Sequence, residues 1–399
     1  IALLWATVSI FSQHPREGFQ PENRRTPEQQ SEERSPDSHG KWKSMAPFLA
    51  SPHSLKSLQE FYRLDSLLEE DWDMAASSYA GDFKAYYTYN EAGSLTEFRS
   101  VTRNDESGTW DPYDRETYLY DEESRLVLFT DYDLDESGTE WYDSWAEAFN
   151  YADGRLIETI EAQRDGPGEE AYPVWKTVFS YDESGWVTGT MEYIFLFDWE
   201  LTWKTERTYS ESGQLLTYTD FNDSDTDPSG WVYVDRETYS YDEENLLTEY
   251  VRIEWDEEAG VWVNVDREEF DLQSNGDVQG FIDFDWNEMD EQWEMNRKLE
   301  YTYKPGVTYE QLWIPWFYMD DIPNYFNSQL ISYAGYDYES GEWVNAFRGT
   351  YFYTAPEATG LRTSGRSSFT LYPNPASSSV RLSADGIPAD GLSGLLSVE

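Results

Sequence analysis

Residues 231–247, WVYVDRETYSYDEENLL, contain the pattern that decides the fold. A Trp, a basic residue and the motif aromatic-x-Tyr follow one another, and a short acidic turn then leads to an apolar residue. The second Tyr of this motif is called the anchor. Anchors recur every 28 to 32 residues and then once after 50, at Tyr89, Tyr120, Tyr151, Tyr181, Tyr209, Tyr241, Leu272, Tyr303 and Tyr353. This regular spacing identifies the body of the chain as a repeat.

Three further columns keep the register of the anchors. The residue two places before the anchor is aromatic in eight of nine repeats, and Arg207 is the exception. A base stands five places before it at Lys84, Arg115, Lys176, Lys204, Arg236, Arg267, Lys298 and Arg348. Trp stands ten places before it at Trp110, Trp141, Trp199, Trp231, Trp262, Trp293 and Trp343. The last repeat keeps all three columns, so the longer final spacing indicates an insertion at about residues 304–338.

Each repeat is predicted to be one β-hairpin. Offsets of ten, two and zero share parity, so a regular strand places Trp, the aromatic residue and the anchor on one face and the base on the other. A turn follows, with Gly185 or Asn275 where positive φ is tolerated. A second strand then opens on an apolar residue such as Leu95 or Leu247. Frequent turns between β-branched and aromatic residues favour strands over helices.

The expected fold is all-β, a long antiparallel β-meander of about nine hairpin repeats. Flat sheets of this width are rare, so we expect a curved or superhelical sheet, with closure into a barrel or shell as the alternative. Residues 63–67 lie one period before the second strand of the first complete hairpin. They are expected to form either a half-repeat cap or a short helix. The apolar insertion is expected to plug an open end of the sheet or to form a binding loop.

Composition excludes several classes of protein. The 399 residues include no Cys, which excludes disulfides and thiolate metal sites, and His14, His39 and His53 all precede the repeats. Residues 51–353 carry 19 bases and 69 acids, a net charge of 19 minus 69, or -50. This charge argues against nucleic acid as a partner, because phosphate binding needs a basic face. The aromatic content of 17% argues against disorder of the whole chain.

The segment before the repeats has two parts. Residues 1–12, IALLWATVSIFS, are apolar, uncharged and too short to span a bilayer, so they are predicted to be part of a signal peptide, with a buried strand as the alternative. Residues 13–50 are rich in Pro, Ser, Glu, Gln and Arg without a hydrophobic period, which predicts a disordered linker. The repeat domain then covers residues 51–353, and no transmembrane span is predicted.

Two groups of motifs carry a resemblance to known families. Tyr118-Leu-Tyr-Asp121 and Phe179-Ser-Tyr-Asp-Glu-Ser-Gly185 resemble YD (RHS-like) repeats, although the period here is longer, and the whole unit is similar to a repeat of secreted Bacteroidota proteins. After a linker at residues 354–368, the motif Tyr372, Pro373, Asn374 and Pro375 resembles the opening of the type A C-terminal sorting domain of the type IX secretion system.

The resemblance has consequences for the end of the chain and for its location. It implies a small β-sandwich sorting domain that begins in residues 369–399 and is truncated there. It also implies the type IX secretion machinery as a partner, and a secreted or outer-surface-attached protein of a Gram-negative bacterium.

The sequence favours binding over catalysis. No His lies in residues 61–355, which excludes Ser-His-Asp triads and His metal sites there, whereas paired carboxylates for glycoside hydrolysis remain open among so many acids. The Trp column is either a stacked core or an aromatic platform for polysaccharide or a surface protein. We predict a non-catalytic binding or adhesion module. An inert structural spacer or a calcium-stabilised surface scaffold is the alternative, and a carbohydrate-active enzyme is less favoured.

Calcium is the one cofactor that the sequence suggests. Asp131, Asp133 and Asp135 alternate along the chain, as do Asp223, Asp225 and Asp227, which is the spacing that calcium loops use. Neither run has the Gly and the Glu of an EF-hand loop.

Overall fold

The computed structural model describes residues 61–355 apart from 105–106, 136, 225–228 and 315–326. These residues form strands joined by tight turns, and no α-helix is found among them. The strands are β1 Tyr62–Asp73, β2 Ser78–Tyr89, β3 Leu95–Arg103, β4 Trp110–Tyr120, β5 Leu126–Leu134, β6 Trp141–Ala152, β7 Arg155–Gln163, β8 Tyr172–Tyr181, β9 Val187–Phe195, β10 Trp199–Tyr209, β11 Leu215–Asp223, β12 Trp231–Tyr241, β13 Leu247–Asp256, β14 Val261–Leu272, β15 Val278–Asn287, β16 Gln292–Thr308, β17 Leu312–Trp313, β18 Ser328–Glu339 and β19 Glu342–Thr354. The predicted all-β hairpin repeat is therefore confirmed.

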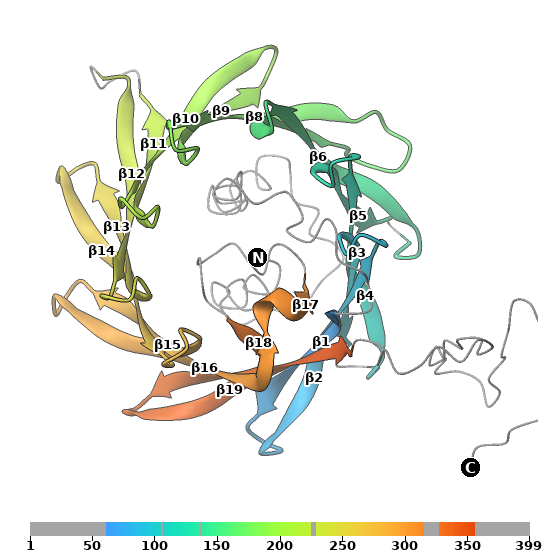
Figure 1. The fold of residues 1–399 in the computed structure, drawn as a ribbon, viewed down its shortest axis with the longest axis vertical. Helices are drawn as coiled ribbons and strands as arrows, with labels where there is room; N and C mark the ends of the chain where they lie inside the picture. The colour runs from blue at the N-terminus through green and yellow to red at the C-terminus, as the bar shows by residue number, and fades with distance from the viewer. Residues whose placement is uncertain (1–60, 105–106, 136, 225–228, 315–326, 356–399) are drawn as a thin grey trace, which may run out of the picture. The chain divides into compact units, whose positions relative to one another are not determined.

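The sheet closes on itself, which corrects the expected open, curved or superhelical sheet. Each strand pairs antiparallel with the next from β1 to β16, then β16 pairs with β18 and β18 with β19, and β1 closes the ring against β19 (Figure 1). Eighteen strands thus form an antiparallel barrel, and β17 lies outside this order.

The seam explains why the ring closes. Leu64 of β1 pairs with the last anchor, Tyr353, as Leu95 pairs with the first anchor, Tyr89. One residue is skipped just after the pair in both cases, at Asp65 and at Thr96. The half-repeat at residues 63–67 is thus a strand, and it supplies the missing second strand of the ninth hairpin. Closure leaves no exposed sheet edge at either end of the meander.

A β-bulge seven places before the anchor interrupts the first strand of every repeat. The extra residues are Asp82, Tyr113, Ser144, Val174, Thr202, Val234, Val265, Asn296 and Ala346. An extra residue reverses the alternation of side chains along a strand. The prediction that Trp shares a face with the anchor is therefore wrong, because Trp lies beyond the bulge and shares the face of the base.

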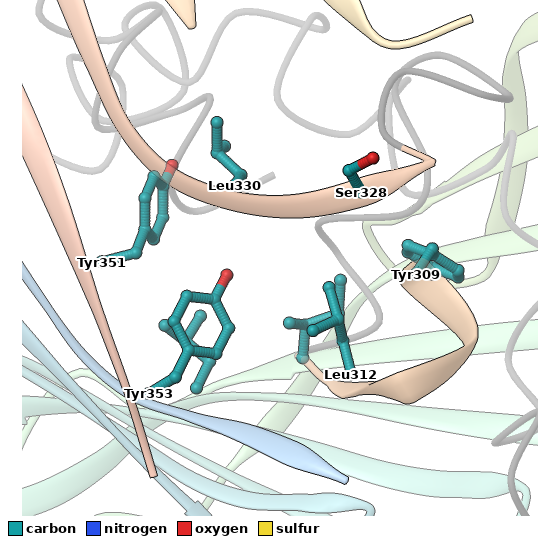
Figure 2. Close-up of a pocket in the computed structure, with 8 residues that line it drawn as sticks. Tyr309, Leu312, Ser328, Leu330, Tyr351 and Tyr353 are labelled. Atoms are coloured by element: carbon teal, nitrogen blue, oxygen red, sulfur yellow. The ribbon is translucent and has the colours of Figure 1, made fainter. Parts of the chain in front are cut away.

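The anchors face the inside of the ring. The short strand β17 lies within the ring in Figure 1 and pairs with β1 through Leu312 and Tyr62. Leu312 lines a cavity of about 20 Å³ together with Tyr351 and the anchor Tyr353 (Figure 2). The face that carries the anchors and the aromatic residues two places before them is called the inner face, and the opposite one the outward face. The main core cluster lies on the inner face and includes Tyr118.

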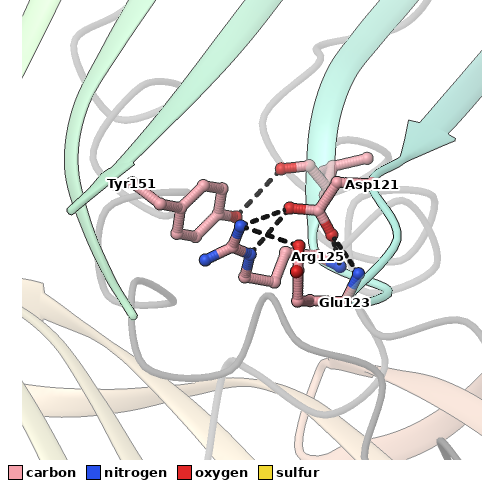
Figure 3. A network of polar contacts seen from close by, with 5 residues as sticks. Asp121, Glu123, Arg125 and Tyr151 are labelled. Atoms are coloured by element: carbon pink, nitrogen blue, oxygen red, sulfur yellow. Dashed lines mark hydrogen bonds and ion pairs between the residues drawn. The ribbon is translucent and has the colours of Figure 1, made fainter. Parts of the chain in front are cut away.

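The turns explain the Asp that follows the anchor in several repeats. The Asp121 carboxylate accepts hydrogen bonds from the backbone N–H groups of Glu123 and Arg125, at 3.0 and 2.8 Å. Arg125 pairs with Asp121 and lies 4.8 Å from the ring of the next anchor, Tyr151 (Figure 3). The Tyr151 hydroxyl in turn donates to the Leu126 carbonyl at 2.9 Å. Neighbouring turns are thereby fixed to one another around the ring.

The anchor hydrogen bond recurs around the ring. In this bond, the hydroxyl of an anchor donates to a backbone carbonyl at the start of the second strand of the preceding repeat. The same bond is made by Tyr181, Tyr209, Tyr241 and Tyr303, to Leu156, Val187, Leu215 and Val278. This explains on physical grounds why Tyr recurs at the anchor position.

The insertion begins as a continuation of β16 and returns to the sheet at β18. A single turn of 3₁₀ helix, Tyr309–Gln311, leads into β17. Trp313 is 2% exposed, and its ring lies against Gly93 in the first hairpin turn and stacks on Phe61 at 5.7 Å. The insertion therefore joins the two ends of the ring. No helix among the described residues has the length and hydrophobicity that a membrane span requires.

Candidate functional site

The seven Trp of the predicted column lie on the outward face, and they are called the Trp belt: Trp110, Trp141, Trp199, Trp231, Trp262, Trp293 and Trp343. The base of the preceding repeat reaches five of their rings. Lys84 Nζ lies 3.9 Å from the centre of the Trp110 ring, and the Arg236 guanidinium lies 4.7 Å from that of Trp262. Lys176, Lys204 and Lys298 lie in the same way over Trp199, Trp231 and Trp343. Cation–π attraction thus links each of these hairpins to the next.

Most belt rings also contact an aromatic ring on the strand that precedes their own in the chain. Trp262 packs edge-on against Trp255 at 5.2 Å, and Trp293 packs edge-on against Trp286 at 5.1 Å. Phe195 and Tyr338 contact Trp199 and Trp343 in the same way. Such pairs stabilise the hairpins by about 0.5–1.5 kcal/mol each beyond the area that they bury.

The belt is neither a buried core nor a free-standing platform. All seven Trp are half-buried. Binding of a ligand by the Trp column stays a prediction. Belt positions of adjacent repeats are two strands apart, which corresponds to ~9.6 Å along the ring, and Trp141 and Trp199 are four strands apart because Ala171 stands between them.

The bases of the belt form ion pairs with acids on the same face, as expected for cations in an acidic protein. Arg115 Nε is 3.0 Å from Glu97 Oε1, and Lys204 Nζ is 2.8 Å from Glu206 Oε1. Because these groups are partly open to water, each pair contributes little stability, about 0–1 kcal/mol.

The acidic runs do not form a metal site among the described residues. Asp135 caps the turn after β5 by accepting hydrogen bonds from the N–H groups of Thr139 and Glu140. Asp131 and Asp133 lie in β5, and Asp223 ends β11, while Asp225 and Asp227 lie outside the described residues. Within the described ranges, no cluster of three acids suited to a metal ion is found. Calcium binding stays a prediction.

Buried carboxyl groups on the inner face were not singled out from the sequence. Glu69 is 4% exposed and accepts a hydrogen bond from Tyr333, and burial, with Asp71 and Asp82 nearby, raises its pKa to about 8. Burial raises the pKa of Asp283 to about 7 and that of Asp114 to about 6. These side chains sit among the aromatic columns, so the carboxyl groups are desolvated.

Two further carboxyl groups, those of Glu116 and Glu237, also accept a hydrogen bond from a Tyr hydroxyl. Tyr118 donates to Glu116 and Tyr239 donates to Glu237, in each case to the residue two places before it in the same strand. The only sequence signal for these two carboxyl groups is an acidic residue four places before the anchor. This signal cannot be distinguished from the many exposed acids. The motif Tyr372, Pro373, Asn374 and Pro375 and the predicted signal, linker and sorting segments lie outside the described residues.

No known family and no curated protein matches the sequence. Among solved structures, a protein of unknown function from Bacteroides fragilis is 18% identical over 35% of this chain and 87% of its own, with a TM-score of 0.25. A porin-like protein from Bacteroides uniformis is 10% identical over 73% of this chain and 98% of its own, with a TM-score of 0.33. The Tc holotoxin pore of Photorhabdus luminescens is 14% identical over 67% of this chain and 14% of its own, with a TM-score of 0.21. Similarities this weak transfer neither an overall fold nor an activity to this chain.

Proposed function

We propose that the protein is a non-catalytic binding module of the cell surface or of the secreted fraction, and that its Trp belt binds polysaccharide. The observation that carries this proposal is the repetition of half-exposed Trp rings on the outward face. A half-exposed ring offers an apolar face on which the C–H face of a sugar can stack. Adjacent acids and bases offer hydrogen-bond partners for sugar hydroxyl groups.

The spacing of the belt supports a polymer rather than a single sugar. Successive positions are ~9.6 Å apart, about the length of two sugar rings in an extended chain. A chain that follows the ring contacts several Trp at once, so weak individual contacts add up to useful avidity. An isolated sugar gains none of this effect.

The chemistry of the outward face supports contact with water rather than with lipid. Arg99, Lys204 and Arg348 project from it with their acidic partners, and a lipid-facing wall does not tolerate such charges near its centre. The resemblance of residues 368–382 to the start of a type IX sorting domain supports export to the cell surface or the medium.

Tryptophan quenching of the full chain tests the proposal. We expect acrylamide to quench the fluorescence readily, and a polysaccharide that binds the belt to suppress that quenching. Trp262→Ala is expected to weaken binding of this polysaccharide about 5- to 10-fold, because one stacking position is lost. Trp203→Ala is the matched control, since Trp203 is also half-buried but pairs with the buried Glu192 on the inner face.

Two results would contradict the proposal. Failure of neutral, acidic and sulfated polysaccharides alike to alter the quenching would favour an inert structural spacer. Equal loss of binding in Trp203→Ala and Trp262→Ala, with both variants folded, would place the binding surface elsewhere.

A further inference from the structure

One buried charged side chain on the inner face forms no ion pair among the described residues. Arg207 lies two places before the anchor Tyr209, where the other eight repeats carry an aromatic ring. Its side chain is 4% exposed, and its Nε, Nη1 and Nη2 atoms make no hydrogen bond within the described part of the chain. A buried guanidinium without a partner is strongly unfavourable, so a chain that keeps one here needs a reason to do so.

An aromatic ring lies beside this guanidinium. Its carbon atom lies 4.8 Å from the centre of the Tyr218 ring, and Tyr218 is its partner across the β10–β11 hairpin. The adjacent anchor, Tyr209, stacks on Trp186 with ring centres 5.5 Å apart. The donor fork of Arg207 is thus held beside the Tyr218 ring.

The acid on the partner strand does not neutralise Arg207. Asp220 is 7% exposed on β11, and no salt bridge joins it to Arg207 within the described residues. Burial, followed by the nearby Asp235, raises the pKa of Asp220 well above its usual value, which favours the uncharged form. An uncharged Asp220 leaves the positive charge of Arg207 available to an incoming anion.

We propose that Arg207 is the anchor of a binding site on the inner face for a small carboxylate anion. The planar fork of a guanidinium matches the two oxygens of a carboxylate. The site lies on the opposite face from the Trp belt, so this proposal does not rest on the proposed function.

Substitution of Arg207 by the residue type of the other repeats tests the site without disrupting the pattern. In Arg207→Phe, an aromatic ring replaces a buried unpaired charge, so the free variant is expected to melt at a higher temperature than the natural protein. Glucuronate and acetate are expected to raise the melting temperature of the natural protein by ~2 °C or more at saturation and to change its Trp186 fluorescence. Neither anion is expected to affect Arg207→Phe, and uncharged glucose is expected to affect neither protein.

Three outcomes would overturn the site. Lack of any response of the natural protein to glucuronate and acetate would show that Arg207 recognises no free carboxylate. An equal response to glucose would show that the site does not recognise the carboxylate. A loss of melting temperature in Arg207→Phe, together with no response of the natural protein, would show that a carboxylate of the chain itself already fills the site.

Discussion

The protein is expected to become more stable as the pH falls from 9 to 5, the reverse of the behaviour of a protein held together by exposed ion pairs. Glu69 has a pKa of about 8 in the folded protein, against an ordinary value of 4.5. Between these values the folded state holds a proton that the unfolded state releases, so acid favours folding. The contribution is complete below pH 4.5 and is lost as the pH rises through 8.

Glu69 is buried enough for this effect to be large. A shift from 4.5 to about 8 corresponds to on the order of 5 kcal/mol, since one pKa unit is about 1.4 kcal/mol. Asp283 and Asp114, with pKa values of about 7 and 6, act in the same direction over a narrower range. Thermal melts at pH 5, 7 and 9 at constant ionic strength measure the summed contribution of these three groups to stability.

Glu69→Gln separates this group from the general effect of the negative charge. The amide is neutral at every pH and still accepts a hydrogen bond from Tyr333, so the variant is expected to gain stability at pH 9 and to lose much of the pH dependence. Glu258→Gln, at an exposed position in the β13–β14 turn, is the control for removal of one negative charge. If the two variants changed the melting profile equally, Glu69 would not be the group that titrates.

The second large effect is expected at the seam of the ring. Leu67 is 1% exposed on β1 and pairs with Ala85 of β2 on one side and with Tyr351 of β19 on the other. Leu67→Ala removes apolar contacts at the place where the two ends of the chain meet, and the expected loss is about 2–5 kcal/mol. Denaturant unfolding followed by circular dichroism measures it.

Leu119→Ala provides the matched control for the seam. Leu119 is 57% exposed on the outward face of β4, so the same change of side chain is expected to alter stability by less than about 0.5 kcal/mol. Comparable losses in the two variants would mean that the seam is not a buried junction.

The hairpins could be predicted because the residues that begin the strands and form the turns recur in the sequence. Trp231 and Leu247 begin strands as expected, and the turn after Tyr181 has Gly185 at positive φ. The face of the Trp column could not be predicted from parity alone. The bulge adds one residue between Trp231 and the base Arg236, and no Gly or Pro marks it in that stretch. Hydrogen-bond register is a property of the paired strands and not of one strand.

The sequence does not decide between an open and a closed sheet, although a signal for closure is visible once the structure is known. Leu64 stands where a second strand opens, but nothing in the sequence names Tyr353 as its partner. Arg207 was recorded only as an exception in an aromatic column, because absence of an ion pair is a property of the folded chain. The inner carboxyl groups were missed for the same reason, since burial of Glu69 depends on strands far apart in sequence.

Cross-linking of the seam tests the closed ring most directly. Glu70 on β1 and Arg348 on β19 are paired across the seam, and their side chains form an ion pair at 2.6 Å. The natural chain contains no Cys, so a Glu70→Cys and Arg348→Cys double variant carries only the two introduced thiols. A Glu70→Cys and Lys204→Cys variant, with its thiols on the non-adjacent strands β1 and β10, is the control, since β1 pairs with β2 and β19 and β10 pairs with β9 and β11. Under mild oxidation a closed ring gives an intramolecular disulfide in the first variant alone. Disulfides only between molecules, or equal yields in both variants, would contradict closure.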